Sequence, residues 1–448
     1  MLDRVYLLIH DGVRGGPRNA ARLVRHLPRW LVRRVARARL THLLRYVWRR
    51  SPAQRERWHR AGVRRRHLRS PDVLARIPFT TSDDLARRPE DFACVPERDL
   101  IHLIGTSGTT GHAKKLGLTE RDLDHQTRLF ASKLHQLPGA SRVLAVFIVD
   151  SPTWSTGWYV RRGVEKAGMF GLLAANDCDT SFLIDLIREY DIDTLITTPT
   201  TMHRMTLEAR CDLRALGLRY ALLSAQPWSE AFRAEMESAW HVTALDAYGM
   251  NELGGSIAAE CPHKTGLHIS DVDFHVEIVD PETGAPLEAG REGEVVVTTL
   301  ARRGMPLVRY RTGDLARLFD EDHRCPCGVP LSTMSRIRGR LDDMLILGPG
   351  TNVYPDEFDR AILSVRGVSD YQLVVEKDAW RDVLSLTVEA DEPIETLRQP
   401  LLDALMGIPY LRDACWKTRT LVVGGMEALG RGTLSEGRPK SVRFIDRR

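Results

Sequence analysis

The sequence predicts an α/β protein with a large N-terminal domain and a smaller α+β C-terminal domain. From about residue 100 to 260, short apolar runs alternate with stretches of helical period, as in "RVLAVFIVD", "FLIDLIREYDIDTLITTPTTMHRM" and "RYALLSAQPWSEAFRAEMESAW". That alternation is typical of a largely parallel sheet covered by helices. The length of 448 residues also exceeds that of one compact domain, so at least two domains are expected.

The first 75 residues are predicted to be helical, because apolar positions recur every three or four residues through "ARLTHLLRYVWRR". Pro71 and Pro78 interrupt this pattern. The next stretch, "TTSDDLARR", begins with residue types that cap a helix.

Between residues 268 and 320 the pattern changes to that of a β subregion. The stretch "HVEIVDPETGAPLEAGREGEVVVTTL" holds two strand-like runs joined by a loop rich in Pro, Gly and Glu, which indicates antiparallel pairing. After "RIRGRLDDMLILGPG" the chain returns to mixed α/β character. We therefore predict an N-terminal domain over residues 1–340 and a C-terminal domain over 341–448.

Composition and charge exclude several classes of protein. The net charge of +5 is small for this length and comes largely from the first 70 residues, where runs of arginine are usually solvated helix faces. No basic stripe interleaved with aromatic residues indicates nucleic-acid binding, and no run approaches the ~20 apolar residues of a membrane span. The start lacks the pattern of a secretory signal, and an odd number of cysteines, seven, favours a reducing compartment. We expect a cytoplasmic monomer or homodimer that binds neither nucleic acid nor membrane.

The stretch "GTSGTTGHAKK", residues 105–115, follows an apolar run and predicts an anion-binding loop. Backbone N–H groups in a Gly/Ser/Thr turn form a concave anion site, and glycine lets the backbone approach the ligand closely. The spacing of its glycines and lysine does not match the Walker loop or the G-x-G-x-x-G pattern. The lysines are informative because only eight of the 64 basic residues are lysine.

Three further motifs follow in a fixed order. "YGMNE" (248–252) places an aromatic ring, a glycine and an acid in a tight stretch, "YRTGDL" (310–315) ends a strand with a carboxylate, and "RIRGRLDDML" (336–345) lies at the predicted boundary. Each alone is usually a turn or a solvated charge. Together with the loop at 105–115 they form a constellation.

The constellation S-G-T-T-G-x-x-K, Y-G-x-x-E, Y-R-T-G-D, G-R-x-D-D and a lysine near the C-terminus resembles the adenylate-forming superfamily of acyl-CoA synthetases and adenylation domains. The closer resemblance is to phenylacetate-CoA ligases and coenzyme F390 synthetases, through "IPFTTSDDL", "CPHKTGLHI", "LVRYRTGDL" and "KSVRFIDRR". It extends from about residue 40 to residue 448. The resemblance implies a large adenylate-forming domain, a small mobile C-terminal domain and an ATP-dependent, AMP-forming ligase.

The resemblance also assigns a role to each matching residue. Such enzymes join a carboxylate to the α-phosphorus of ATP, so two anions must meet and charge neutralisation must dominate catalysis. The residues implied to hold the β- and γ-phosphates are Ser107, Gly108, Thr109, Thr110, Gly111 and the catalytic Lys114. Those implied to surround the adenine, the ribose and the rest of the nucleotide are Ala225, Gln226, Tyr248, Gly249, Asp314 and Arg340. Glu252 is implied to help place Mg²⁺.

Two residues of the C-terminal part complete the implied machinery. Asp342 matches the hinge on which the small domain turns between the two half-reactions, and Lys440 matches the mobile catalytic lysine that bridges the carboxylate and the α-phosphate. Lysine and arginine are not interchangeable at such a position, because a slim point charge differs from a guanidinium.

The cysteines suggest a second site. Cys325 and Cys327 form a two-thiol turn, and Cys261 and His268 lie some sixty residues earlier. A Cys₃His set satisfies tetrahedral zinc, whereas buried thiols without a ligand are the common alternative. Some phenylacetate-ligase-like proteins carry a metal at matching positions, so the resemblance implies a structural zinc, with His263 as a rival ligand.

The acyl substrate and the acceptor are left open. The segment "DSPTWSTGWYVRRGVEKAG" (150–168) matches the aromatic pocket of relatives, where Trp154, Trp158 and Tyr159 would suit a ring. Relatives usually carry glutamate where this chain has Gln226, and "LILGPGTNVYP" has one extra residue in the turn that approaches CoA. Three hypotheses follow. One is an aryl-acid CoA ligase. Another is an adenylating enzyme of specialised metabolism, such as antibiotic biosynthesis, that loads a carrier protein or acts as a nitrite-activating diazotase. The third is a nucleotide-binding scaffold, which the presence of Lys440, Glu252 and Asp314 together disfavours.

Overall fold

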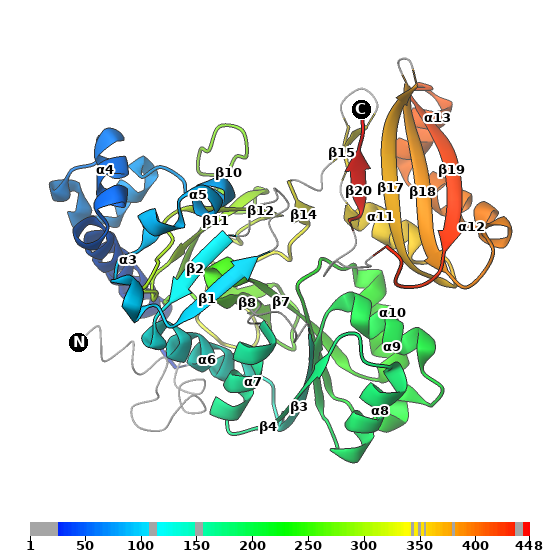
Figure 1. The fold of residues 1–448 in the computed structure, drawn as a ribbon, viewed down its shortest axis with the longest axis horizontal. Coiled ribbons are helices and arrows are strands. Elements are labelled where there is room, and N and C mark those ends of the chain that lie inside the picture. Colours follow the sequence, from blue (N-terminus) through cyan, green and yellow to red (C-terminus); the bar gives the residue numbers. More distant parts are fainter. Residues whose placement is uncertain are drawn as a thin grey trace. The chain divides into compact units, whose positions relative to one another are not determined.

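The computed structural model describes residues 26–106, 114–147, 156–341, 345–347, 351–353, 355–378, 381–434 and 442–448. The chain divides into two compact units (Figure 1). The first unit comprises residues 1–198, 214–225 and 241–337, and the second comprises 199–213, 226–240 and 338–448. Among the described residues, no helix combines the length and the apolar character needed to cross a membrane.

The helices predicted near the start are present as α3 (Arg29–Arg50) and α4 (Pro52–Arg60). Ser51 caps α4 by accepting a hydrogen bond from the Gln54 N–H at 3.2 Å. Beyond α4 the chain forms two 3₁₀ helices, η1 (Arg65–Arg69) and η2 (Pro71–Arg76), instead of a further α-helix. The predicted capped helix is α5 (Ser82–Arg87), whose capping box pairs Thr81 with Asp84.

An eight-stranded sheet forms the centre of the first unit, in the order β13-β9-β8-β7-β6-β5-β3-β4. The strands from β4 to β7 are parallel, and β8, β9 and β13 continue the sheet in antiparallel pairing. The parallel strands are β3 (Arg142–Phe147), β4 (Phe170–Ala175), β5 (Thr194–Thr197), β6 (Tyr220–Ser224) and β7 (Thr243–Met250). The antiparallel strands are β8 (Gly255–Glu260), β9 (Leu267–Ile269) and β13 (Thr333–Met334).

Helices connect the parallel strands, as the alternating pattern predicts. Helices α6 (Glu120–Leu134) and α7 (Thr156–Lys166) lie side by side (Figure 1) and pack on the sheet through an apolar cluster that includes Phe130, Tyr159 and Leu245. The remaining connections are α8 (Thr180–Glu189), η5 (Leu213–Leu216), α9 (Pro199–Glu208) and α10 (Glu230–Trp240), the last two belonging to the second unit.

The predicted β subregion is an antiparallel sheet that contains β10 (Phe274–Val279), β11 (Gly293–Thr299) and β12 (Tyr310–Ala316). Val276 pairs with Val297 in this ladder. The hairpin of β1 (His102–Thr106) and β2 (Lys114–Leu118) flanks the predicted anion loop. The short helices η3 (Pro89–Phe92) and η4 (Glu97–Asp99) lie between α5 and β1.

The second unit has its own sheet, in the order β19-β18-β17-β20, and its own apolar core around Phe358, Tyr371 and Leu401. The long strands β17 (Val368–Asp378), β18 (Arg381–Ala390) and β19 (Leu421–Leu429) run side by side (Figure 1), and β20 (Phe444–Asp446) pairs with β17. The other elements are β14 (Gly339–Arg340), β15 (Leu345–Leu347), β16 (Thr351–Val353), α11 (Pro355–Ile362), α12 (Ile394–Met406) and α13 (Pro409–Trp416). The predicted fold class is confirmed.

The buried carboxylate of Asp122 fastens the start of α6 to a distant loop. It accepts hydrogen bonds from the backbone N–H of Thr119 (3.1 Å), of Arg303 (2.7 Å) and of Gly304 (2.9 Å). The Asp122 side chain is only 3% exposed. Its removal would therefore leave these three N–H groups without their acceptor.

We expect Asp122→Ala to lower the free energy of unfolding of the first unit by about 2–3 kcal/mol, because buried N–H groups lose their acceptor. Denaturant unfolding followed by tryptophan fluorescence measures the change. The exposed Asp185 of α8 provides the control, since Asp185→Ala should shift stability by less than about 0.5 kcal/mol. Equal effects of the two substitutions would contradict this role of Asp122.

Candidate active site and metal centre

The carboxyl ends of β6 and β7 bring the first group of predicted residues together. The two strands pair in parallel, with Ser224 opposite Ala247. Ala225 follows β6 directly with a left-handed φ of 74°, and Tyr248 and Gly249 lie near the end of β7. In open α/β sheets, ligands bind in the crevice outside the carboxyl ends of the strands.

Tyr248 connects this edge to the antiparallel sheet. Its hydroxyl donates a hydrogen bond of 2.6 Å to the Asp314 carboxylate on β12. Both side chains are buried, at 8% and 5% exposure. Two predicted motifs, 66 residues apart in the chain, therefore meet at one point.

The third motif reaches the same strand. Arg336, in "RIRGR", donates from Nε to the Asp246 carboxylate at 2.8 Å, two residues before Tyr248 on β7. The Asp246 N–H in turn donates to the Glu260 carboxylate on β8 at 2.8 Å. Asp246 is therefore held by one ion pair through its side chain and by one hydrogen bond from its backbone N–H to a carboxylate.

Gly249 lies where no side chain fits. A Cβ atom there would lie 2.3 Å from the backbone oxygen of Gly255 and 2.9 Å from the Cα of Ser256. The β7–β8 register also shifts between Tyr248 and Gly249, and such bulges are frequent beside active sites. Glycine is therefore required at this position by the close approach of β8.

Glu252 is held immediately after this strand. It lies in the short helix η6 (Asn251–Leu253) and is 5% exposed. The guanidinium of Arg302 donates to the Glu252 backbone carbonyl. Burial lowers the pKa of Arg302 to about 10, against the opposing charges of Asp122 and Glu252, so Arg302 keeps its positive charge beside Glu252 at neutral pH.

Lys133 of α6 is a half-buried lysine that the sequence reasoning missed. Its ammonium donates to the Ser256 carbonyl at 2.8 Å and to the Ser256 hydroxyl at 2.9 Å. Burial lowers the pKa of Lys133 to about 7, partly opposed by the charge of Asp273. The scarcity of lysine was a usable signal, but nothing in the local pattern distinguishes Lys133 from a solvated helix residue.

The segment predicted to line the acyl pocket is described from Thr156 onward. Tyr159 is buried on α7, packs edge to face against Phe130 and approaches Gly255, where a Cβ atom would lie 2.8 Å from its hydroxyl. Trp158 is 40% exposed and stacks on His102. Trp154 lies outside the described residues.

Other predicted residues belong to the second unit or lie outside the described part of the chain. Gln226 and Arg340 belong to the second unit, where the Gln226 side-chain oxygen accepts from the Thr200 N–H at 3.2 Å and the Thr200 hydroxyl at 2.8 Å. Lys114 begins β2, and its side chain is not described. The residues that lie outside the described part are Ser107, Gly108, Thr109, Thr110, Gly111, Asp342 and Lys440.

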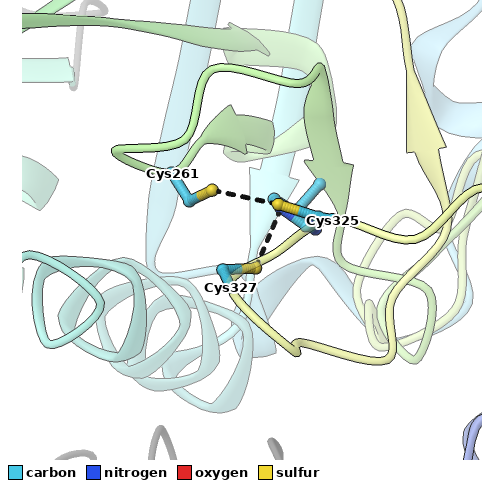
Figure 2. A group of neighbouring side chains, drawn as sticks. Cys261, Cys325 and Cys327 are labelled. Carbon is cyan, nitrogen blue, oxygen red and sulfur yellow. Dashed lines mark hydrogen bonds between the residues drawn. The ribbon is translucent and has the colours of Figure 1, made fainter.

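Cys261, Cys325 and Cys327 converge near one edge of the large sheet (Figure 2). His268 belongs to the same group. Cys261 follows β8, His268 lies on β9, and the other two lie between β12 and β13. The Cys261 and Cys325 sulfurs are 3.4 Å apart, and the Cys327 sulfur is 3.4 Å from His268 Nε2.

This donor set fits a tetrahedral metal ion. All four ligand atoms lie within 4.8 Å of one another. This is compatible with a tetrahedral zinc site, in which two sulfurs lie about 3.8 Å apart. His268 Nδ1 is buried and has no hydrogen-bond partner among the described residues, and His268, rather than the rival His263, belongs to the group. Three cysteines and one histidine would fill all four positions, as in structural sites.

Comparisons with known proteins identify the family of the chain. The AMP-binding enzyme family matches residues 34–301, and the AMP-binding enzyme C-terminal domain matches residues 350–448. The chain is 34% identical over 400 residues to a phenylacetate-coenzyme A ligase of Thermus thermophilus, covering 86% of this chain and 89% of that protein. It is 32% identical to the phenylacetate-coenzyme A ligase of Escherichia coli, covering 80% and 82%.

Solved structures share the fold. A 2-hydroxyisobutyryl-CoA ligase in complex with its adenylate superposes with a TM-score of 0.78 at 23% identity, covering 93% of this chain and 89% of that one. An anthranilate CoA ligase in complex with anthranoyl-AMP superposes with a TM-score of 0.56 at 17% identity, covering 75% and 65%. The chain belongs to the AMP-binding enzyme family, in the branch of the phenylacetate-coenzyme A ligases, and is an ATP-dependent, AMP-forming ligase.

Proposed function

We propose that the enzyme activates an aromatic carboxylic acid as its acyl-adenylate and transfers the acyl group to CoA. The observation that carries the proposal is the buried Tyr248–Asp314 hydrogen bond, which supports a nucleotide position at the carboxyl ends of β6 and β7. The phenylacetate-CoA ligases among the relatives support the aromatic acid and the CoA acceptor.

In this proposal Asp314 binds the ribose. One carboxylate oxygen accepts from Tyr248, which orients the group, and a carboxylate has further acceptor capacity for the two ribose hydroxyls. Tyr248 and Gly249 flank the adenine, with Ala225 and Gln226 along its other side. Arg340 is proposed to bind the nucleotide as well.

The chemical step brings two anions together, so cations must surround the phosphates. Ser107, Gly108, Thr109, Thr110, Gly111 and Lys114 are proposed to hold the β- and γ-phosphates. Glu252 would hold Mg²⁺, which neutralises phosphate oxygens when bound. Lys440 is proposed to bridge the carboxylate and the α-phosphate after the second unit turns about Asp342.

A second candidate is transfer to another acceptor. The extra residue in "LILGPGTNVYP" and the glutamine at position 226 depart from the pattern of relatives and favour a changed acceptor. Loading of a carrier protein, or activation of nitrite by a diazotase of specialised metabolism such as antibiotic biosynthesis, would use the same adenylation site. We also propose a reducing cytoplasmic location, which would keep the three cysteines of the cluster from forming disulfides.

Pyrophosphate release tests the reaction and the acceptor. Purified protein with ATP and Mg²⁺ is given a panel of aromatic acids and amino-acids, each with CoA, with nitrite or with neither. We expect release with an aromatic acid and formation of its CoA thioester. Pyrophosphate release that requires nitrite but not CoA would instead support the diazotase. No pyrophosphate release, with ATP still bound, would contradict both the CoA ligase and the diazotase.

Lys440→Ala should abolish pyrophosphate release while leaving ATP affinity within about twofold, because a bridging ammonium acts mainly in the transition state. Lys417→Ala is the matched control, since Lys417 lies exposed on the same unit and pairs with Asp413. An unchanged rate in Lys440→Ala would remove the catalytic role.

Asp314→Asn should weaken ATP binding by about ten- to a hundredfold, because an amide cannot accept from both ribose hydroxyls and charged hydrogen bonds contribute about 1.5–3 kcal/mol. Isothermal titration with ATP and 2′-deoxy-ATP measures the effect. The native enzyme should prefer ATP, and the variant should lose that preference. Asp185→Asn on α8 is the control. A variant that still discriminates the two nucleotides would contradict ribose binding by Asp314.

We further propose that Cys261, His268, Cys325 and Cys327 bind one structural zinc ion. Elemental analysis should find about one zinc per chain. Cys325→Ser should lose the metal and lower the melting temperature, whereas Cys211→Ser, at an exposed thiol, should change neither. The zinc site would be contradicted if the protein contained no metal and Cys325→Ser left its melting temperature unchanged.

A further inference from the structure

A groove of about 500 Å³ lies on the first unit, and one of its residues, Arg324, directly precedes Cys325 of the four-residue cluster. One wall is the N-terminal part of α3, and the other is the loop between β12 and β13. We call it the arginine groove, and its lining residues are Arg29, Trp30, Arg33, Arg34, Arg37, Glu321, Asp322 and Arg324.

Both walls are fixed to each other. The Arg29 guanidinium donates to the backbone carbonyls of Glu321 (2.8 Å) and His323 (3.0 Å). Beneath the groove, Val32 and Val35 of α3 pack against Val272 and Val329. Hydrogen bonds and apolar packing therefore hold the two sides of the groove together.

The groove carries an excess of positive charge. Five arginines line it against two carboxylates. Glu321 pairs with Arg33 at 2.6 Å and Asp322 lies 3.9 Å from Arg324. Outside the groove, Asp72 pairs with Arg37 at 3.3 Å. Burial, followed by the neighbouring charges of Arg33 and Arg324, lowers the pKa of Arg29, partly opposed by the carboxylates of Asp271 and Glu321. The first turn of α3 also contains no acidic residue, although the helix dipole favours negative charge there. A bound anion would relieve this repulsion.

The spacing of the charges indicates the kind of anion. Arg29, Arg33 and Arg37 follow one another at intervals of one helical turn, so their row extends about 12 Å along the helix. A single phosphate is too compact to contact such a row, whereas carboxylates on successive side chains of a polypeptide match it. Trp30 is 62% exposed beside the row, and tryptophan and arginine are the residues most often responsible for binding energy in protein interfaces.

The acidic residues at the edge of the groove favour a protein partner over a nucleic acid. Glu321 and Asp322 are exposed opposite the arginines, and a nucleic-acid backbone bears a continuous negative charge that they would repel. A polypeptide can instead present charges of both signs. We propose that the arginine groove docks an acidic segment of a partner protein.

Fluorescence anisotropy with the full chain tests the proposal. The probe is a short fluorescein-labelled peptide of alternating glutamate and leucine, and its reference is the same peptide with glutamine in place of glutamate. We expect binding of the acidic peptide alone, weakened by added salt because the contacts are charged.

The double variant Trp30→Ala/Arg34→Glu should raise the Kd for the acidic peptide at least about tenfold. The matched control is Trp416→Ala/Arg398→Glu, which removes an exposed tryptophan and reverses an exposed arginine on the second unit. Its Kd should equal that of the native chain. Circular dichroism and pyrophosphate release should be unchanged in both variants, because neither pair lies among the proposed catalytic residues.

Three results would overturn the proposal. The first is no binding of the acidic peptide, and the second is an equal loss of binding in the two double variants. The third is displacement of the peptide by a single-stranded oligonucleotide at lower concentration than by unlabelled peptide, which would assign the groove to nucleic acid.

Discussion

The hydrogen bond from Tyr248 to Asp314 is the contact on which the candidate site depends, because it joins two sheets with separate hydrogen-bond ladders. β7 belongs to the eight-stranded sheet and β12 to the antiparallel sheet. A buried carboxylate requires a donor, and the tyrosine hydroxyl supplies one at 2.6 Å. This bond orients a carboxylate of one sheet at the carboxyl edge of the other.

The elements of the fold were largely predictable from sequence, but their arrangement was not. β3, β6 and α10 follow from local apolar periodicity, and α5 follows from its cap. The order that places β3 between β4 and β5 depends on contacts between distant strands, which no local pattern encodes. Likewise, the motifs around Tyr248 and Asp314 were recognisable, whereas the bond between them required the folded chain.

The residues that sequence reasoning missed have common residue types, and their local sequence does not distinguish them from surface residues. Asp122 looks like a helix-capping acid, and Arg302 looks like one of many surface arginines. Their roles come from burial and from distant backbone partners. The four-residue cluster was easier to anticipate because thiols and imidazoles are rare, yet the choice of His268 over His263 depended on its position on β9, opposite Thr333 of β13.

Asp122 and Arg302 together link α6 to the end of β7. Asp122 holds the backbone of residues 303 and 304, and Arg302, next in the chain, holds the carbonyl of Glu252. An axial displacement of α6 would thus be transmitted to Glu252 through one covalent segment. Insertions or deletions of single residues in α6 should consequently be far rarer among functional descendants of this chain than changes of residue type on its solvent face.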